Sequence, residues 1–329
     1  MREITPENAA EYLRAAGRVP DGRAVAVRAL GWGVSNVVMR VEVEGEHPYV
    51  LKQARERLRT KKLWVSRLER IWTERDALEL LGSFLEPEGT VPRVLFSDDE
   101  NYLYAMTHAP EEAVVWKEQL LAGAIDPEVA RRAGEVLGTI HKTTRAPGVL
   151  GARFDDATVF DELRIDPFYR ESARAHPAIK PQIDALIASM ANAPDRCLVL
   201  GDFSPKNILV HDKGLTLVDF ETAHAGDPAF DLGFFLSHLF LKSLRRDGPA
   251  LDAYSILKRA FLSGYGGVTG LMVGGVIARA ESHENACTLA RIDGKSPVDY
   301  LDDEERGIAR AAALNGLRSA ARGTGNAFE

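Results

Sequence analysis

The segment LVLGDFSPKNILVHDKGLTLVDFETAHAGDPAF, residues 198–230, places three polar side chains at intervals that decide the fold. Asp202 and Asn207 are five residues apart, and Asp219 follows twelve residues later, directly after an apolar run. Two short strands joined by a glycine-containing turn would bring the three side chains to one place. The predicted strands span residues 208–211 and 215–218.

The residue types in this segment indicate phosphoryl transfer. Asp202 is predicted to accept the proton of an attacking hydroxyl or to orient it, while Asn207 and Asp219 hold Mg²⁺ through hard oxygen ligands. A single Asp in a turn or Asn at a strand start would be unremarkable, but three in this register predict a shared site. Glu221 lies two residues beyond Asp219, where it either binds a second metal ion or caps the following turn.

Composition bounds the class of protein. The chain has 329 residues, of which 45% are hydrophobic and 27% charged, so we expect a soluble globular protein of two lobes. The formal net charge is −7, whereas nucleic-acid-binding proteins usually carry an excess of basic residues. The N-terminus resembles no signal peptide, and no apolar stretch is long enough to span a bilayer. Cys197 and Cys287 are predicted to be buried thiols, so we expect a cytoplasmic protein with no membrane or nucleic-acid partner.

The first third of the chain predicts an α+β unit, and the remainder is mostly helical. Period-two patterns predict strands over residues 23–31, 36–43, 47–53, 91–97 and 102–106, with a long helix over 61–82. Further helices are predicted over 112–122, 127–144, 177–192, 228–244, 250–262, 270–290 and 297–322. We therefore expect a small lobe at 1–107 with a five-stranded antiparallel sheet and one main helix, a hinge at 108–112 and a helical lobe at 113–329.

A glycine-containing turn lies between the first two predicted strands. Gly31 and Gly33 would let backbone N–H groups, including those near Ser35 and Asn36, approach phosphates. The turn alone is a weak signal, because many hairpins contain two glycines. The sequence has no GxxxxGK[ST], which excludes a Walker-type phosphate loop.

Lys52 lies at the end of an otherwise apolar strand segment. If its side chain points inward it needs an anion, which ATP phosphates and a helix carboxylate would supply. The alternative is an edge-strand lysine that points to water. Glu74, in the middle of the predicted long helix, is our candidate partner, with Glu69 and Glu79 as rivals.

Three further residues are interpreted as structural. Asp227 is predicted to be the N-cap of the next helix with Pro228 at its first position. Asp231 is expected to hydrogen-bond the backbone of the loop around Asp202. His141 is interpreted as a core residue of its helix rather than a catalyst.

These motifs resemble the aminoglycoside phosphotransferase and choline kinase family of protein-kinase-like enzymes. The resemblance runs over nearly the whole chain and is most specific in Gly201-Asp-Phe-Ser-Pro-Lys-Asn207, Asp219-Phe-Glu221 and Gly226-Asp-Pro-Ala-Phe-Asp231. It implies a bilobal fold with ATP in the cleft, adenine on the backbone of Met106–His108, and transfer of the γ-phosphate to a small-molecule hydroxyl. One position departs from the family, which usually has His where this chain has Leu200. We nevertheless expect an active kinase.

The acceptor is less well defined. Residues 160–169 resemble a segment of methylthioribose kinases, and Asp219-Phe-Glu221 is similar to their Asp-x-Glu variant, so a sugar or sugar-like alcohol is the preferred acceptor. An aminoglycoside kinase and a nucleotide-binding pseudokinase scaffold remain alternatives. Three cationic residues either contact a sugar or its anionic group or are solvated helix ends: Arg279, Arg291 and Lys295.

Overall fold

The computed structural model describes residues 1–31, 35–58, 64–245, 247–248, 251–270 and 273–323. Two compact units divide the chain at residue 113: Met1–Ala113 and Val114–Glu329. Among the described residues, no helix combines the length and apolar character needed to cross a bilayer.

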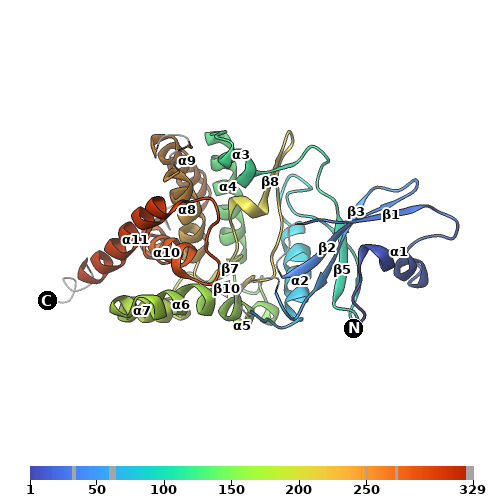
Figure 1. Cartoon of the computed structure of the whole chain (residues 1–329), viewed down its shortest axis with the longest axis horizontal. Helices are drawn as coiled ribbons and strands as arrows, with labels where there is room; N and C mark the ends of the chain where they lie inside the picture. Colours follow the sequence, from blue (N-terminus) through green and yellow to red (C-terminus); the bar gives the residue numbers. More distant parts are fainter. Residues whose placement is uncertain (32–34, 59–63, 246, 249–250, 271–272, 324–329) are drawn as a thin grey trace. The chain divides into compact units, whose positions relative to one another are not determined.

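The first unit is built on a five-stranded antiparallel sheet, as the sequence predicts (Figure 1). Its strands lie in the order β1-β2-β3-β5-β4. Their bounds are β1 (Val25–Ala29), β2 (Asn36–Val43), β3 (Tyr49–Ala54), β4 (Val94–Asp98) and β5 (Leu103–Thr107). Gly45, at φ 78°, provides the left-handed residue in the turn between β2 and β3.

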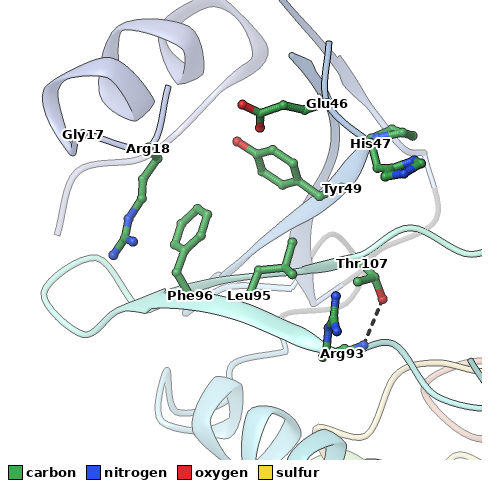
Figure 2. A pocket seen from close by; sticks show the side chains of 10 residues that line it. Gly17, Arg18, Glu46, His47, Tyr49, Arg93, Leu95, Phe96 and Thr107 are labelled. Atoms are coloured by element: carbon green, nitrogen blue, oxygen red, sulfur yellow. Dashed lines mark hydrogen bonds between the residues drawn. The ribbon is translucent and has the colours of Figure 1, made fainter. Parts of the chain in front are cut away.

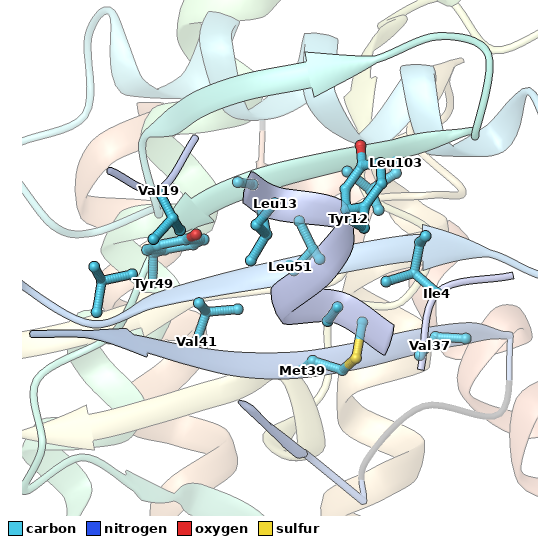
Figure 3. Close-up of a cluster of buried hydrophobic side chains, with 13 residues drawn as sticks. Ile4, Tyr12, Leu13, Val19, Val37, Met39, Val41, Tyr49, Leu51 and Leu103 are labelled. Carbon is cyan, nitrogen blue, oxygen red and sulfur yellow. The ribbon is translucent and has the colours of Figure 1, made fainter. Parts of the chain in front are cut away.

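The two faces of this sheet have different roles because successive side chains alternate between them. One face carries Met39, Val41 and Leu51, which pack against helix α1 (Pro6–Ala15) in a buried core (Figure 3). Thr5 and Asn8 form a capping box at the start of α1. Lys52 lies one position from Leu51 and therefore faces the other side, where helix α2 (Arg70–Gly82) packs.

Helix α2 begins later than the pattern predicts. The expected start at residue 61 falls in 59–63, which lie outside the described residues, but Trp64–Glu69 are described and are not helical. Instead, Val65 forms an isolated antiparallel bridge with Arg57, and Leu58 N donates to Trp64 O at 2.9 Å. The apolar residues Val65 and Leu68 therefore lie in a bridge and a turn that precede the helix.

The second unit is mostly helical (Figure 1). Its longer helices are α3 (Trp116–Leu121), α4 (Pro127–Thr144), α7 (Lys180–Ala191), α8 (Ala229–Ser243), α9 (Leu251–Thr269), α10 (Val273–Asp293) and α11 (Asp303–Gly323). The short strands are β6 (Val114–Val115), β7 (Cys197–Val199), β8 (Ile208–His211), β9 (Gly214–Leu217) and β10 (His224–Gly226). The predicted hairpin is thus present as β8 and β9.

Helix α8 lies at the centre of this unit, packed against α9 and α10. It is buried along almost its whole length, as expected for a helix that is apolar on all sides. Helices α4 and α9 approach closely because glycine replaces a side chain at the contact. A Cβ at Gly134 would overlap the backbone of Phe261, and one at Gly264 would overlap that of Arg131.

Several predicted helix bounds in this unit are wrong. The helix expected over 112–122 starts as strand β6, because Val114 and Val115 are β-branched and pair with β8. The helix expected from 297 begins at Asp303, where Asp302 and Glu305 exchange backbone-to-carboxylate hydrogen bonds of 2.8 and 2.9 Å. Helix α9 continues to Thr269, beyond the predicted end at 262.

One helical region has no counterpart in the sequence-based prediction. It comprises α5 (Thr158–Phe160), the wide π-helical segment η2 (Asp161–Arg170) and α6 (Glu171–Ala175). Pro167 lies inside η2 and disrupts the ordinary helical pattern. Both cysteines are free and buried, as predicted.

Candidate active site

Three side chains predicted to act together line one small pocket in the second unit. Asp202, Asn207 and Asp219 share this pocket with the apolar residues that flank them. The β8–β9 hairpin brings them together, since Ile208 pairs with Leu217 and Val218 N donates to Asn207 O at 3.0 Å. Residues separated by up to seventeen positions in the sequence therefore meet at the open end of one hairpin.

Asn207 and Asp202 are directly linked. The Nδ2 of Asn207 donates to Oδ2 of Asp202 at 2.8 Å and to its backbone oxygen at 3.0 Å. Since the amide nitrogen of Asn207 is engaged by Asp202, the Oδ1 of Asn207 is the side-chain atom that remains for a cation. Asp219 adopts φ 73°, a left-handed conformation that is rare for a residue with a side chain and frequent at functional sites.

A third residue, Arg164, contacts Asp202 and was not selected from the sequence. Its Nη2 lies 3.0 Å from Asp202 Oδ2, and its Nε donates to Gly201 O at 2.5 Å. The guanidinium is almost buried, so it holds the carboxylate in a fixed direction. Arg164 lies in η2, the irregular segment that the sequence did not reveal, which explains why no pattern indicated it.

The loop that carries Asp202 is supported by Asp231. This carboxylate is fully buried and accepts from Leu200 N at 2.7 Å and from Gly201 N at 2.8 Å. His141 Nε2 lies 3.2 Å from the same carboxylate, and the other nitrogen of its ring lies 3.1 Å from Tyr265 OH. The predicted bracing role of Asp231 and the predicted core position of His141 are both confirmed.

Two of the three cationic candidates are engaged in structural ion pairs. Arg279 forms a two-point pair with Asp227 through Nε at 2.8 Å and Nη2 at 3.0 Å. Asp227 also accepts from Ala229 N at 3.0 Å, which caps α8 as predicted, although the helix is assigned one residue later. Lys295 pairs with Asp166 at 2.8 Å.

The residues present fit a magnesium site that depends on nucleotide phosphates. Among the described residues, no three His, Cys, Asp or Glu side chains are grouped to hold one ion. Mg²⁺ is commonly bound by only one or two carboxylates together with substrate phosphates and water. Asn207 and Asp219 provide such a partial set in one pocket. Glu221 is buried in the turn after Asp219.

In the first unit, Lys52 and Glu74 form the predicted ion pair. Lys52 Nζ lies 2.7 Å from the Glu74 carboxylate, and the side chains are 6% and 1% exposed. Lys52 also lies opposite Tyr104 in the β3–β5 register. The lysine therefore points into the unit and not to solvent, which removes the edge-strand alternative.

The residues after the glycine turn are held by Arg70, which the sequence reading did not single out. Its Nη2 donates to Ser35 O at 2.6 Å and to Arg55 O at 2.5 Å. Ser35 and Asn36 are buried at the start of β2. Gly31 is exposed in the turn, whereas Gly33 lies outside the described residues.

Met106 and His108 lie at the end of the sheet. Met106 is buried in β5 opposite Val50, and His108 follows the strand. His108 Nδ1 lies 2.5 Å from Ala109 O, and its Nε2 lies 3.4 Å from Arg40 Nη1. These contacts fix the side chain of His108, the last residue of the segment expected to bind adenine.

A groove of about 440 Å³ opens elsewhere on the first unit (Figure 2). It is lined by Arg18, Glu46, Tyr49 and Phe96, among others. Burial raises the pKa of Tyr49 to about 12, so its hydroxyl stays protonated. No candidate site residue lines this groove.

Comparison with known proteins gives consistent matches. A family described as "Phosphotransferase enzyme family" matches residues 26–268. Methylthioribose kinase of Yersinia pestis (strain Pestoides F) is 26% identical over 265 residues, which cover 72% of this chain and 64% of that protein. The match thus spans less than two thirds of the relative's length.

Solved structures share the fold. A putative fructosamine-3-kinase from Thermobifida fusca aligns with TM-score 0.57 and 22% identity over 97% of this chain and 100% of that one. Choline kinase from Cryptosporidium parvum aligns with TM-score 0.63 and 13% identity over 97% of both chains. The predicted protein-kinase-like fold is therefore confirmed.

Proposed function

Because the chain belongs to the phosphotransferase enzyme family, we propose that it moves the γ-phosphate of ATP to a hydroxyl of a small molecule. The observation that carries this proposal is the pocket shared by Asp202, Asn207 and Asp219. A proton acceptor beside two oxygen ligands for a cation is the equipment that such a transfer requires. A sugar or sugar-like alcohol is the preferred acceptor, supported by the similarity to methylthioribose kinase.

Asp202 holds the acceptor hydroxyl and receives its proton as the new bond forms. The hydroxyl oxygen attacks the γ-phosphorus, the bond to the β-phosphate oxygen breaks, and ADP leaves with the electron pair. Arg164 and Asn207 keep the Asp202 carboxylate in one orientation through contacts of 3.0 and 2.8 Å. This positioning lowers the entropic part of the barrier.

Lys52 contributes a positive charge for the nucleotide phosphates. Glu74 fixes the ammonium direction, since the two side chains are buried together. The backbone near Ser35 and Asn36, held by Arg70, is proposed to approach the same phosphates. Met106 and His108 are proposed to present backbone groups to the adenine.

Asn207 and Asp219 are proposed to hold Mg²⁺, with Glu221 as a further ligand. When bound, the ion offsets negative charge on the phosphates. Asp219 follows the end of β9 in a left-handed conformation, and we propose that its carboxylate faces the ion from there. Holding that conformation costs folding free energy, which is consistent with a functional constraint.

The test is ADP release from Mg·ATP with the purified full chain across neutral sugars, methylthioribose, sugar acids, sugar phosphates, aminoglycosides and choline. Asp202→Asn is the paired variant, because it keeps the shape of the side chain and removes the proton acceptor. Acceptor-dependent ADP release that falls by about 100-fold or more in Asp202→Asn supports the proposal. Equal rates in both proteins would refute it. Nucleotide binding without turnover by either protein would favour the scaffold alternative.

A further inference from the structure

A group of basic side chains lies buried at the C-terminal end of α8, outside the machinery described above. Lys242 is 1% exposed, and the hydrogen bond of its Nζ is to the backbone oxygen of His238 at 3.2 Å. Among the described residues, no carboxylate lies within ion-pair distance of this ammonium. A buried ammonium without a counter-charge is costly, so its presence calls for an explanation.

The neighbours of Lys242 are also basic or lack polar partners. Its Nζ lies 5.3 Å from the centre of the Tyr300 ring, and Lys117 Nζ lies 5.7 Å from the same centre. In the described part of the chain, three nearby polar atoms have no hydrogen-bond partner: His238 Nε2, Arg291 Nε and Tyr300 OH. We refer to Lys117, His238, Lys242, Arg291 and Tyr300 as the basic cluster.

Acidic residues do little to compensate this charge. Asp299 lies 3.9 Å from Lys117, but its side chain is 86% exposed and therefore well solvated. Arg291 is bound to Ser296 rather than to a carboxylate. Burial, followed by repulsion from Lys117, Arg291 and Arg245, lowers the pKa of Lys242 to about 7. Lys117 and Arg291 therefore carry most of the positive charge of the cluster, and a bound anion would hold Lys242 in its charged form. Within the residues that the structure describes, no carboxylate forms an ion pair with Lys242 or Arg291.

The basic cluster lies close to the catalytic loop. On α8, His238 lies seven positions after Asp231, and Lys242 lies four positions after His238. These spacings place the three side chains on one face of the helix. Asp231 accepts hydrogen bonds from the backbone of Leu200 and Gly201 in this loop. His238 lies about 10 Å from Asp231 along the axis of α8, because seven residues separate them. Arg291 is near enough to Asp202 for the carboxylate to favour its charged form, although burial lowers the pKa of Arg291 overall.

We propose that the basic cluster binds an oxyanion of the phosphate acceptor, so that the acceptor is a hydroxylated small molecule with its own phosphate or carboxylate group. This inference rests on the proposed kinase function. The hydroxyl lies at Asp202 while the oxyanion lies against Lys242 and Arg291. A guanidinium suits the two oxygens of such a group, and an ammonium adds a strong point charge.

The same charges disfavour the antibiotic alternative. Aminoglycosides are polycations, and a site for them needs carboxylates rather than lysine and arginine. A purely structural role for Lys242 is the remaining explanation. It is separable by experiment, because a structural lysine responds to no anion.

The binding test measures the thermal midpoint of the full chain at pH 7 in inorganic phosphate and in chloride of equal ionic strength. We expect phosphate to raise the midpoint of the wild type, since ligands that bind the folded state stabilise it. Lys242→Met and Arg291→Gln should abolish the rise. Lys52→Met should retain it, which excludes the nucleotide site, and so should Lys180→Met, which changes a lysine that is 62% exposed. No rise in the wild type, or an equal rise in Lys242→Met, would overturn the inference.

The kinetic test compares ribose, ribonate and ribose 5-phosphate as acceptors for wild type and Lys242→Met. We expect the KM of the charged acceptors to rise by about 10- to 100-fold in the variant, with little change in kcat. The better of the two charged acceptors identifies the oxyanion. If only neutral acceptors are phosphorylated, with equal KM in both proteins, the inference fails while the kinase function stands. If Asp202→Asn leaves ADP release unchanged, the kinase function fails, whatever phosphate does to the thermal midpoint.

Discussion

Replacing Asp231 by Ala should destabilise the second unit more than any exposed acidic substitution. The carboxylate is fully buried and accepts hydrogen bonds from the backbone N–H groups of Leu200 and Gly201 at 2.7 and 2.8 Å. Alanine removes both acceptors and leaves the two buried donors without these partners. His141 loses a partner at 3.2 Å in the same step.

The magnitude follows from the cost of leaving buried donors unpaired. Each unsatisfied N–H costs about 1–3 kcal/mol, so the two together predict a loss of about 2–6 kcal/mol in the free energy of unfolding. Asp231→Asn should lose about half as much. Its amide keeps one acceptor oxygen, but it turns an NH₂ group towards the second donor.

Urea denaturation followed by circular dichroism at pH 7 measures both variants. Asp99→Ala is the control, because the Asp99 side chain is 80% exposed and its pair with Arg75 is long at 3.6 Å. That control should change the free energy of unfolding by less than about 0.5 kcal/mol. A loss below about 1 kcal/mol in Asp231→Ala would show that the brace contributes little, and the reasoning would be wrong.

Three further predictions concern conformation, packing and pH. Asp219→Gly should raise the free energy of unfolding by about 1 kcal/mol in urea titrations, because glycine adopts φ 73° without strain, yet ADP release should be lost; a destabilised variant would contradict this. Gly264→Ala should lower the thermal midpoint and cost about 1–3 kcal/mol, since its Cβ would overlap the Arg131 backbone, whereas Gly267→Ala meets no neighbour and should be close to neutral. Burial lowers the pKa of His224 and His283 to about 4. Unfolded histidine titrates near about 6.5, so the stabilisation from these neutral rings is complete above that pH and is lost as the pH falls towards 4. Urea midpoints measured from pH 7.5 to 4.5 should show this decline, and His283→Phe should reduce it; a flat profile would count against the buried neutral rings.

The sequence predicted the parts of the fold that depend on local pattern. Strand β2 and helix α4 have the bounds that alternation and capping indicated, and the β8–β9 hairpin brings Asp202, Asn207 and Asp219 to one pocket. For Lys52 the sequence left two interpretations open, an inward cation with a partner or an edge-strand lysine that points to water, and the structure has the first.

Residues that act through distant contacts were not predictable in this way. Arg164 reaches Asp202 from a π-helical segment with an internal proline, for which no periodicity exists. Arg70 lies at the first turn of α2, where an arginine ordinarily faces water, but here it is fully buried and ties together Ser35 and Arg55. Helix α9 continues through its glycines, and its packing against α4 requires one of them, Gly264.

Leu200 stands where the family it resembles usually has His, and the hydrogen bonds around it indicate why the loop keeps its shape. Its N–H donates to Asp231 at 2.7 Å, and its carbonyl accepts from Thr222 Oγ1 at 2.8 Å. Both bonds use the backbone, so the loop is fixed at residue 200 whatever side chain is present. Gly201 follows at φ 72°, with Thr222 packed where a Cβ would lie. Leucine at position 200 therefore leaves in place the backbone hydrogen bonds that support the loop around Asp202. Its presence is not an argument for an inactive scaffold.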